Sequence, residues 1–151
     1  MDMKKVMIVM LAVVFCLCAG NVFAGDAKQE CIDKCKAAAA LVKDKGLDAA
    51  KAEIAKKDGQ FVSEATYVFL QGMDGTMLAH PIKPALMGKN LIDLKDKAGK
   101  EFFKEMIEVA KKGEGWVEYQ WPKPGEEGPS PKVSYVLKVD DNTFVGAGYY
   151  K

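Results

Sequence analysis

A predicted β-hairpin near the middle of the chain constrains the fold more than any other feature of the sequence. Residues 67–70 read as a strand and lead to Asp74-Gly75, the dipeptide that best tolerates the positive φ angles of a tight turn. A second strand-like stretch, residues 76–79, delivers His80, the only histidine of the chain, to the loop that follows. The side chain that ordinarily changes charge near neutral pH is therefore expected at the edge of a sheet.

Residues 1–24 have the organisation of a secretory signal peptide. Lys4 and Lys5 form a basic start, an apolar run covers residues 6–19, and Val22-Phe23-Ala24 resembles a small-residue cleavage site. The alternative is a membrane anchor, but this run is shorter than the roughly 20 apolar residues that a spanning helix needs. We expect cleavage after Ala24 and a periplasmic or secreted location.

The mature chain, residues 25–151, is predicted to be one soluble domain without net charge. Removing the first 24 residues lowers the 22 basic and 21 acidic residues to 20 of each. No basic patch, acidic tail or second long apolar stretch remains, which argues against nucleic acid as a partner and against membrane insertion after cleavage. The chain also lacks arginine, the usual bidentate partner of carboxylates and phosphates, so an anion would have to meet lysine, His80, aromatic hydroxyl or N–H groups, or backbone amides.

The periodicity of apolar residues predicts an α+β domain. Helical patterns cover residues 26–45, 47–57 and 99–112. Strand patterns follow the hairpin of residues 65–80 at 115–121, 132–139 and 143–149. Because neighbouring strands are joined by short turns, the five strands should form a mostly antiparallel sheet.

Two cysteines remain after cleavage, and both lie in the first predicted helix. Cys31 and Cys35 share one apolar stripe with Ala38 and Val42. The stripe allows two readings: a pair of thiols buried on a packing face, or a disulfide between successive helical turns, which an oxidising compartment favours. A metal site lacks further ligands and the haem-attachment motif C-x-x-C-H is absent, so no metal or cofactor is expected.

Strand alternation sorts candidate binding residues onto two faces of the sheet. Lys132 shares a face with Ser134, whereas Tyr135 lies on the other, and Tyr119 and Trp121 oppose Trp116. A pocket made of tryptophan, tyrosine and one lysine suits a small organic anion. The alternative is that these aromatic side chains are ordinary sheet packing and that Lys132 is solvated.

Catalysis finds little support in the sequence. No nucleophile-elbow motif or Cys–His pattern is present, and His80 has no evident acidic partner. Gly146 and Gly148 end a strand but precede no helix, so they are expected to let backbone or a ligand approach the sheet closely rather than to bind a nucleotide. We therefore do not expect an enzyme.

Six blocks of sequence form a recognisable pattern: YVFLQGMDGTMLAHP (67–81), MGKNLIDLKD (87–96), FFKEMIEVAK (102–111), GWVEYQWPKP (115–124), PKVSYV (131–136) and FVGAGYY (144–150). Together they resemble the single Cache domain of the second type, the extracytoplasmic sensor module of many bacterial chemoreceptors and histidine kinases. The resemblance implies a PAS-like fold: a five-stranded, mostly antiparallel sheet with a long N-terminal helix on one face. A loop and helix, residues 81–98 and 99–112, would cover the other face.

The resemblance also implies a ligand, a short carboxylate such as pyruvate, lactate, acetate or propionate. Carried over by position, the candidate site residues are Tyr67, His80, Met106, Trp116, Tyr119, Trp121, Lys132 and Tyr135. Strand alternation cannot place Trp116 and Tyr119 on one face without a bulge.

Members of this family usually continue into a transmembrane helix and a signalling domain, whereas this sequence ends at Lys151. The expectation is a stand-alone binding protein, monomer or homodimer, that presents its ligand to a membrane-bound receptor or kinase. The alternative is a protein-interaction module with a vestigial pocket, dimeric through the apolar stripe of the helix at residues 26–45.

Overall fold

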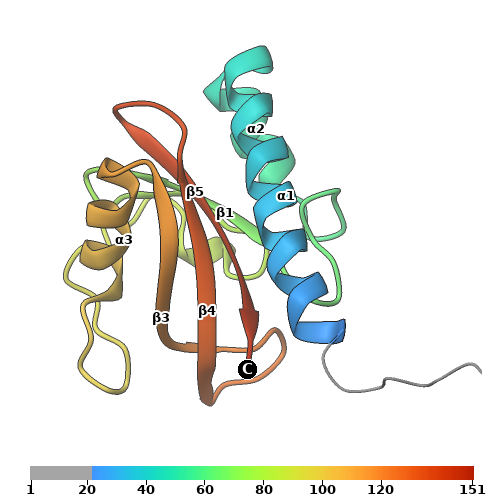
Figure 1. The fold of residues 1–151 in the computed structure, drawn as a ribbon. Coiled ribbons are helices and arrows are strands. Elements are labelled where there is room, and N and C mark those ends of the chain that lie inside the picture. The colour runs from blue at the N-terminus through green and yellow to red at the C-terminus, as the bar shows by residue number, and fades with distance from the viewer. Residues whose placement is uncertain (1–21) are drawn as a thin grey trace, which may run out of the picture.

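The computed structural model describes residues 22–151, so the basic start and apolar run of the predicted signal peptide lie outside the described residues. In this part of the chain the helices are α1 (Val22–Lys45), α2 (Leu47–Ile54), α3 (Phe102–Lys111) and a short 3-10 helix, η1 (Pro84–Leu86). The strands are β1 (Val68–Gly72), β2 (Met77–Ala79), β3 (Glu114–Pro122), β4 (Pro129–Lys138) and β5 (Thr143–Tyr150) (Figure 1). The predicted α+β class is confirmed.

One sheet contains all five strands, in the order β2-β1-β5-β4-β3, and every neighbouring pair is antiparallel. The predicted hairpin joins β1 to β2. Gly75 takes a positive φ of 93° in its turn, and the backbone N–H of Thr76 donates to the Asp74 carboxylate over 2.9 Å. Because strand directions alternate, β1 and β4 begin at the same end of the sheet at which β2, β3 and β5 finish.

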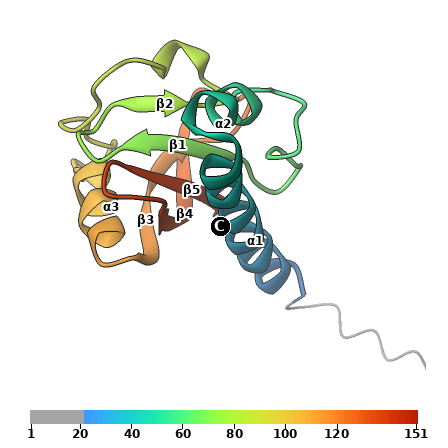
Figure 2. The same ribbon diagram turned by 90° about the horizontal axis from the view of Figure 1, so that it is seen from above.

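Helices cover the sheet on both faces, as Figures 1 and 2 show. Helix α1 runs across one face, with α2 beside it, and buries its stripe of small residues against β1, β4 and β5. Helix α3 covers the other face over β3 and β4, with the long segment between β2 and α3 beside it. The three-layer arrangement is the one that the family resemblance implies.

Strand alternation was predicted correctly, whereas several element boundaries were not. Tyr135 belongs to the apolar core beneath α1, and its neighbour Val136 belongs to the core beneath α3. Helix α3 begins at Phe102 rather than at residue 99, because the Asp96 carboxylate accepts the backbone N–H groups of Ala98 and Lys100 and holds a turn there. Helix α2 ends at Ile54 rather than at residue 57. Helix α1 begins at Val22 rather than at residue 26, α3 ends at Lys111 rather than at residue 112, and β4 begins at Pro129 rather than at residue 132.

Both described cysteines are free thiols, fully buried between α1 and the sheet. The Cys31 Sγ donates to the Thr66 hydroxyl over 3.5 Å, and the Cys35 Sγ donates to the Tyr135 carbonyl over 3.8 Å. The structure therefore agrees with the buried-thiol reading and not with the disulfide. The same stripe packs on the sheet of its own chain, so it gives no support to a dimer built through it.

We expect the two thiols to be nearly unreactive in the folded protein. Burial raises the pKa of both Cys31 and Cys35, so little of the nucleophilic thiolate forms at neutral pH. An aromatic disulfide reagent should react with both only after unfolding, with or without prior reduction. If the unfolded protein reacts with the reagent only after a reductant has been added, the two cysteines form a disulfide instead.

Candidate ligand-binding site

A closed cluster of aromatic and polar side chains lies between the sheet and α3, at the end of the sheet where β1 and β4 begin. We call it the Lys132 cluster. It comprises Tyr67, Phe69, Met77, His80, Phe102, Phe103, Tyr119, Trp121 and Lys132. The space that these side chains enclose is about 10 Å³, roughly what one water molecule needs.

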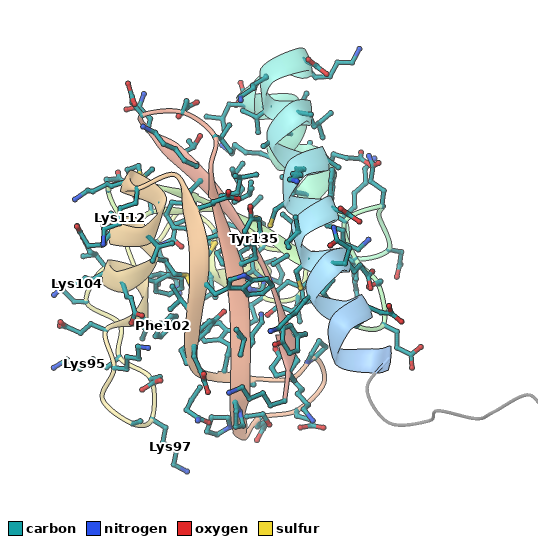
Figure 3. The ribbon with its side chains drawn as sticks, in the orientation of Figure 1. Lys95, Lys97, Phe102, Lys104, Lys112 and Tyr135 are labelled. Atoms are coloured by element: carbon teal, nitrogen blue, oxygen red, sulfur yellow. The ribbon has the colours of Figure 1, made fainter. Side chains whose placement is uncertain are left out.

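Lys132 is the unusual member of this cluster, because its side chain is only 1% exposed. Its Nζ lies 4.0 Å from the centre of the Tyr67 ring and 5.2 Å from that of Tyr150. Burial lowers the pKa of Lys132 from its ordinary 10.5 to about 7, and no carboxylate of residues 22–151 opposes that shift. The lysines labelled in Figure 3 instead extend outward from α3 and the loop before it: Lys95, Lys97, Lys104 and Lys112.

His80 enters the cluster as a neutral hydrogen-bond donor. Its Nδ1 accepts the backbone N–H groups of Ile82, over 3.2 Å, and Lys83, over 2.9 Å, so the neutral ring carries its proton on Nε2. Burial, followed by the positive charges of Lys132 and Lys83, lowers the pKa of His80 to about 3. A general base needs a pKa near the working pH, which this imidazole does not have.

Aromatic rings form the walls around these two polar groups. Phe102 of α3 stacks on Tyr119 of β3, with ring centres 4.6 Å apart and planes 5° apart, and Trp121 meets the edge of Phe102 at 5.7 Å. The Tyr119 hydroxyl is hydrogen-bonded to Ser134 over 2.9 Å, and burial raises the pKa of Tyr119, which keeps its hydroxyl neutral. These rings are buried or half-buried and carry no charge.

Two glycines of β5 make room for the cluster on the surface of the sheet. A Cβ at Gly146 would lie 2.2 Å from the Phe69 ring, which crosses it. A Cβ at Gly148 would lie 2.1 Å from the Ser134 Oγ and 2.8 Å from the Lys132 Cε. The expected role of these glycines, close approach to the sheet, is therefore what the structure shows.

The structure brings together five of the eight predicted site residues: Tyr67, His80, Tyr119, Trp121 and Lys132. Met106 is fully buried in the core beneath α3 but does not line the enclosed space. Trp116 and Tyr135 lie on the α1 face, with ring centres 5.3 Å apart, because β3 pairs with β4 without a bulge. Figure 3 shows the two sides, with Phe102 of α3 on one side of the sheet and Tyr135 on the other, towards α1.

Several contributors to the cluster were missed from the sequence: Phe69, Met77, Phe102, Phe103 and the neighbouring Tyr150. Alternation from Tyr67 could have found Phe69, which lies two residues further along the same strand. Tyr150 pairs with Lys132 across β4 and β5, and no local pattern reveals that pairing. Among residues 22–151, no three histidine, cysteine or acidic side chains converge in a way that could hold a metal.

Comparison with known proteins places this arrangement in a family. The sequence profile of the Cache domain matches residues 38–151, which is most of the chain. The chain belongs to the Cache domain family. The resemblance seen in the sequence is thereby confirmed, and Cache domains are extracytoplasmic sensor domains.

The proteins to which this Cache domain is similar are sensor proteins or their sensor domains. It is 35% identical over 85 residues to the sensor histidine kinase MctS of Rhizobium johnstonii, and the match covers 56% of this chain and 18% of the kinase. A solved periplasmic sensor domain of a chemotaxis protein superposes with a TM-score of 0.74 at 28% identity, covering 87% of this chain and 99% of that one.

A second similar structure is that of a Cache chemosensory domain described as recognising carboxylic acid. That Cache chemosensory domain superposes with a TM-score of 0.65 at 28% identity, covering 84% of this chain and 89% of that one.

In the part of this Cache domain that the structure describes, no helix combines the length and apolar character needed to cross a membrane.

Burial of Lys132 should make the stability of this Cache domain depend on pH. The pKa of Lys132 is about 7 in the fold and 10.5 ordinarily, so between these values the unfolded chain binds more protons. The free energy of unfolding should therefore rise with pH in this window, by up to about 1.4 kcal/mol per pH unit from this group. Urea unfolding of the wild type and of Lys132→Met at several pH values measures the difference. Parallel stability curves for the two proteins would show that Lys132 keeps an ordinary pKa.

Gly148→Ala should disrupt the cluster without replacing any of its side chains. The added methyl group would overlap Ser134, the Val133 carbonyl and Lys132, and overpacking of this kind typically costs about 1–3 kcal/mol. The matched control is Gly128→Ala, since a Cβ at Gly128 meets nothing within 4 Å. Urea unfolding should show a loss for the first variant and almost none for the second. Equal stability in both would mean that Lys132 does not lie on Gly148.

Proposed function

We propose that this Cache domain is an extracytoplasmic binding protein of the sensor type, with a short carboxylate as its ligand. Pyruvate, lactate, acetate and propionate are the candidate ligands. The observation that carries the proposal is the buried Lys132. Its amine can carry a positive charge, and it has no acidic partner within residues 22–151.

A carboxylate would supply the counter-ion that Lys132 lacks. A charged lysine removed from water is costly unless it is paired, which is why burial lowers its pKa. With an anion against Nζ, the charged form regains a partner in surroundings of low dielectric, where charge-assisted hydrogen bonds are strong. No arginine exists in the chain to compete for this role.

His80 and the aromatic walls suit the remainder of such a ligand. The Nε2–H group of His80 is a neutral donor that could take the second carboxylate oxygen or the oxo or hydroxyl group of pyruvate or lactate. The rings of Phe102, Tyr119 and Trp121 would enclose the short apolar part. A carboxylate is larger than the enclosed 10 Å³, so binding requires Lys132 or a neighbouring ring to shift.

The comparisons support both the ligand class and the signalling context. A Cache domain similar in fold is described as recognising carboxylic acid, and a relative in sequence is a sensor histidine kinase. The match covers only 18% of that kinase, so the comparison does not extend to its signalling part. How ligand binding to this chain is passed on is therefore also part of the proposal. We propose that the bound domain acts on a membrane-bound receptor or kinase.

The direct test is a thermal-shift panel of the purified protein with short carboxylates, followed by calorimetry on any acid that stabilises it. A ligand at 100 times its dissociation constant should add about 2.7 kcal/mol to the free energy of unfolding. A panel in which no acid changes the melting temperature or releases heat on binding would contradict the proposal.

Lys132→Met should weaken binding of the same acid by about tenfold to a hundredfold, because a charge-assisted hydrogen bond contributes roughly 1.5–3 kcal/mol. Methionine keeps much of the length of the side chain and removes a buried charge, so the fold should persist. The control is Lys138→Met in the same strand. Lys138 is 35% exposed and pairs with Asp141 at 2.8 Å, so its loss should be almost silent. Equal affinity in the wild type and Lys132→Met would remove Lys132 from the site.

A further inference from the structure

A much larger groove opens at the same end of the sheet, on the other side of Tyr67. We call it the outer groove. Its walls are Ala27 of α1, the segment 62–67, Ile82, the loop at 123–126 and the last residues of the chain, 149–151, and its volume is about 930 Å³. This is within the range of roughly 300–1,000 Å³ that small-molecule sites occupy, whereas the space inside the Lys132 cluster is far below it.

Two tyrosine rings separate the outer groove from Lys132. Tyr67 lines both the groove and the cluster. Tyr150 lines the groove, and its ring lies 5.2 Å from the Lys132 Nζ. The ammonium group of Lys132 therefore lies one ring away from the groove.

We propose that the outer groove is a second compartment of the binding site, which holds the apolar tail of a monocarboxylic acid whose carboxylate meets Lys132. This inference rests on the proposed function, since it assumes that Lys132 binds the carboxylate. It extends the ligand class from the shortest acids to linear or aryl-substituted acids with a longer tail.

The walls of the groove favour such a tail over a second charged group. Val62, Ile82 and Tyr149 offer apolar surface. Glu64, Glu126 and Lys123 also line the groove, and the ammonium of Lys151 is already paired with Glu118 at 2.5 Å, so the two acids outweigh the one further lysine. A dicarboxylate would place its second charge near these acids, so a monocarboxylate fits better.

Tyr150 is the ring that can move to join the two compartments. It is partly exposed, and its hydroxyl donates to the Pro122 carbonyl over 2.7 Å and also interacts with the Tyr67 side chain. Tyr67, in contrast, is only 2% exposed and packs against His80 with ring centres 5.1 Å apart. Rotation of Tyr150 would expose Lys132 to the groove while Tyr67 stays in place.

The test is calorimetry of the purified protein with straight-chain monocarboxylates from acetate to octanoate. If the tail enters the groove, affinity should rise by roughly three- to fourfold for each methylene group added beyond butyrate. The same series with Lys132→Met should be weaker at every length, because the carboxylate has lost its partner.

Ala65→Trp should remove the gain with chain length by filling the groove from an exposed position outside the Lys132 cluster. Acetate and propionate should bind this variant as they bind the wild type. Ala40→Trp is the matched control, since Ala40 is exposed on α1 and does not line the groove. It should keep the whole wild-type series.

Two failures can be told apart. If affinity stays flat or falls beyond butyrate while Lys132→Met still weakens the binding of acetate or propionate, the proposal of a second compartment is wrong. The proposed function would then still stand. Binding of no acid at all, or binding of long acids that neither Lys132→Met nor Ala65→Trp changes, would overturn both.

Discussion

Lys132 carries its ammonium group into the domain against two tyrosine rings rather than against a carboxylate. Cation–π contacts of this kind recover part of the hydration that a buried ammonium loses, but not all of it, and the lowered pKa of Lys132 records the deficit. The ionisable side chains around Lys132 are uncharged. His80 is neutral, and burial raises the pKa of Tyr67 and Tyr119, so neither supplies a negative charge. The domain thus buries a lysine amine that has no acidic partner within residues 22–151 and gains a proton only at the cost that its lowered pKa expresses.

The antiparallel sheet makes that placement possible. Because strand directions alternate, one end of the sheet collects the start of β4, which carries Lys132, and the finish of β2, which precedes His80. The bare backbone of Gly146 and Gly148 lets Phe69 and Lys132 lie flat on the sheet, where any side chain would displace them. The Gly148 carbonyl also accepts the Thr66 hydroxyl over 2.8 Å, and Thr66 accepts the Cys31 thiol of α1. One residue of β5 therefore serves both layers of the core.

The sequence predicts the parts of this site that depend on local pattern. The Asp74-Gly75 turn identifies the hairpin and so the position of His80, and alternation along β4 places Lys132 and Tyr135 on opposite faces. The same alternation already separated Trp116 from Tyr119, and the continuous β3–β4 register keeps them apart. What the sequence could not supply is contact between distant segments. The pairing of Lys132 with Tyr150, the ring of Phe102 on Tyr119 and the groove beside Tyr67 all depend on tertiary packing, for which no spacing rule exists.

The choice of lysine follows from the same electrostatics. Arginine remains charged under all ordinary conditions, so a buried arginine without a partner would carry its full desolvation cost whenever no anion is bound. A lysine whose pKa is about 7 can release its proton instead. The domain then loses only the free energy of deprotonating the amine, and not the full free energy of burying a charge. With a carboxylate bound as proposed, the ammonium form would be favoured again and the proton would return from solvent. A buried cation site without a permanent acidic partner thus favours lysine over arginine.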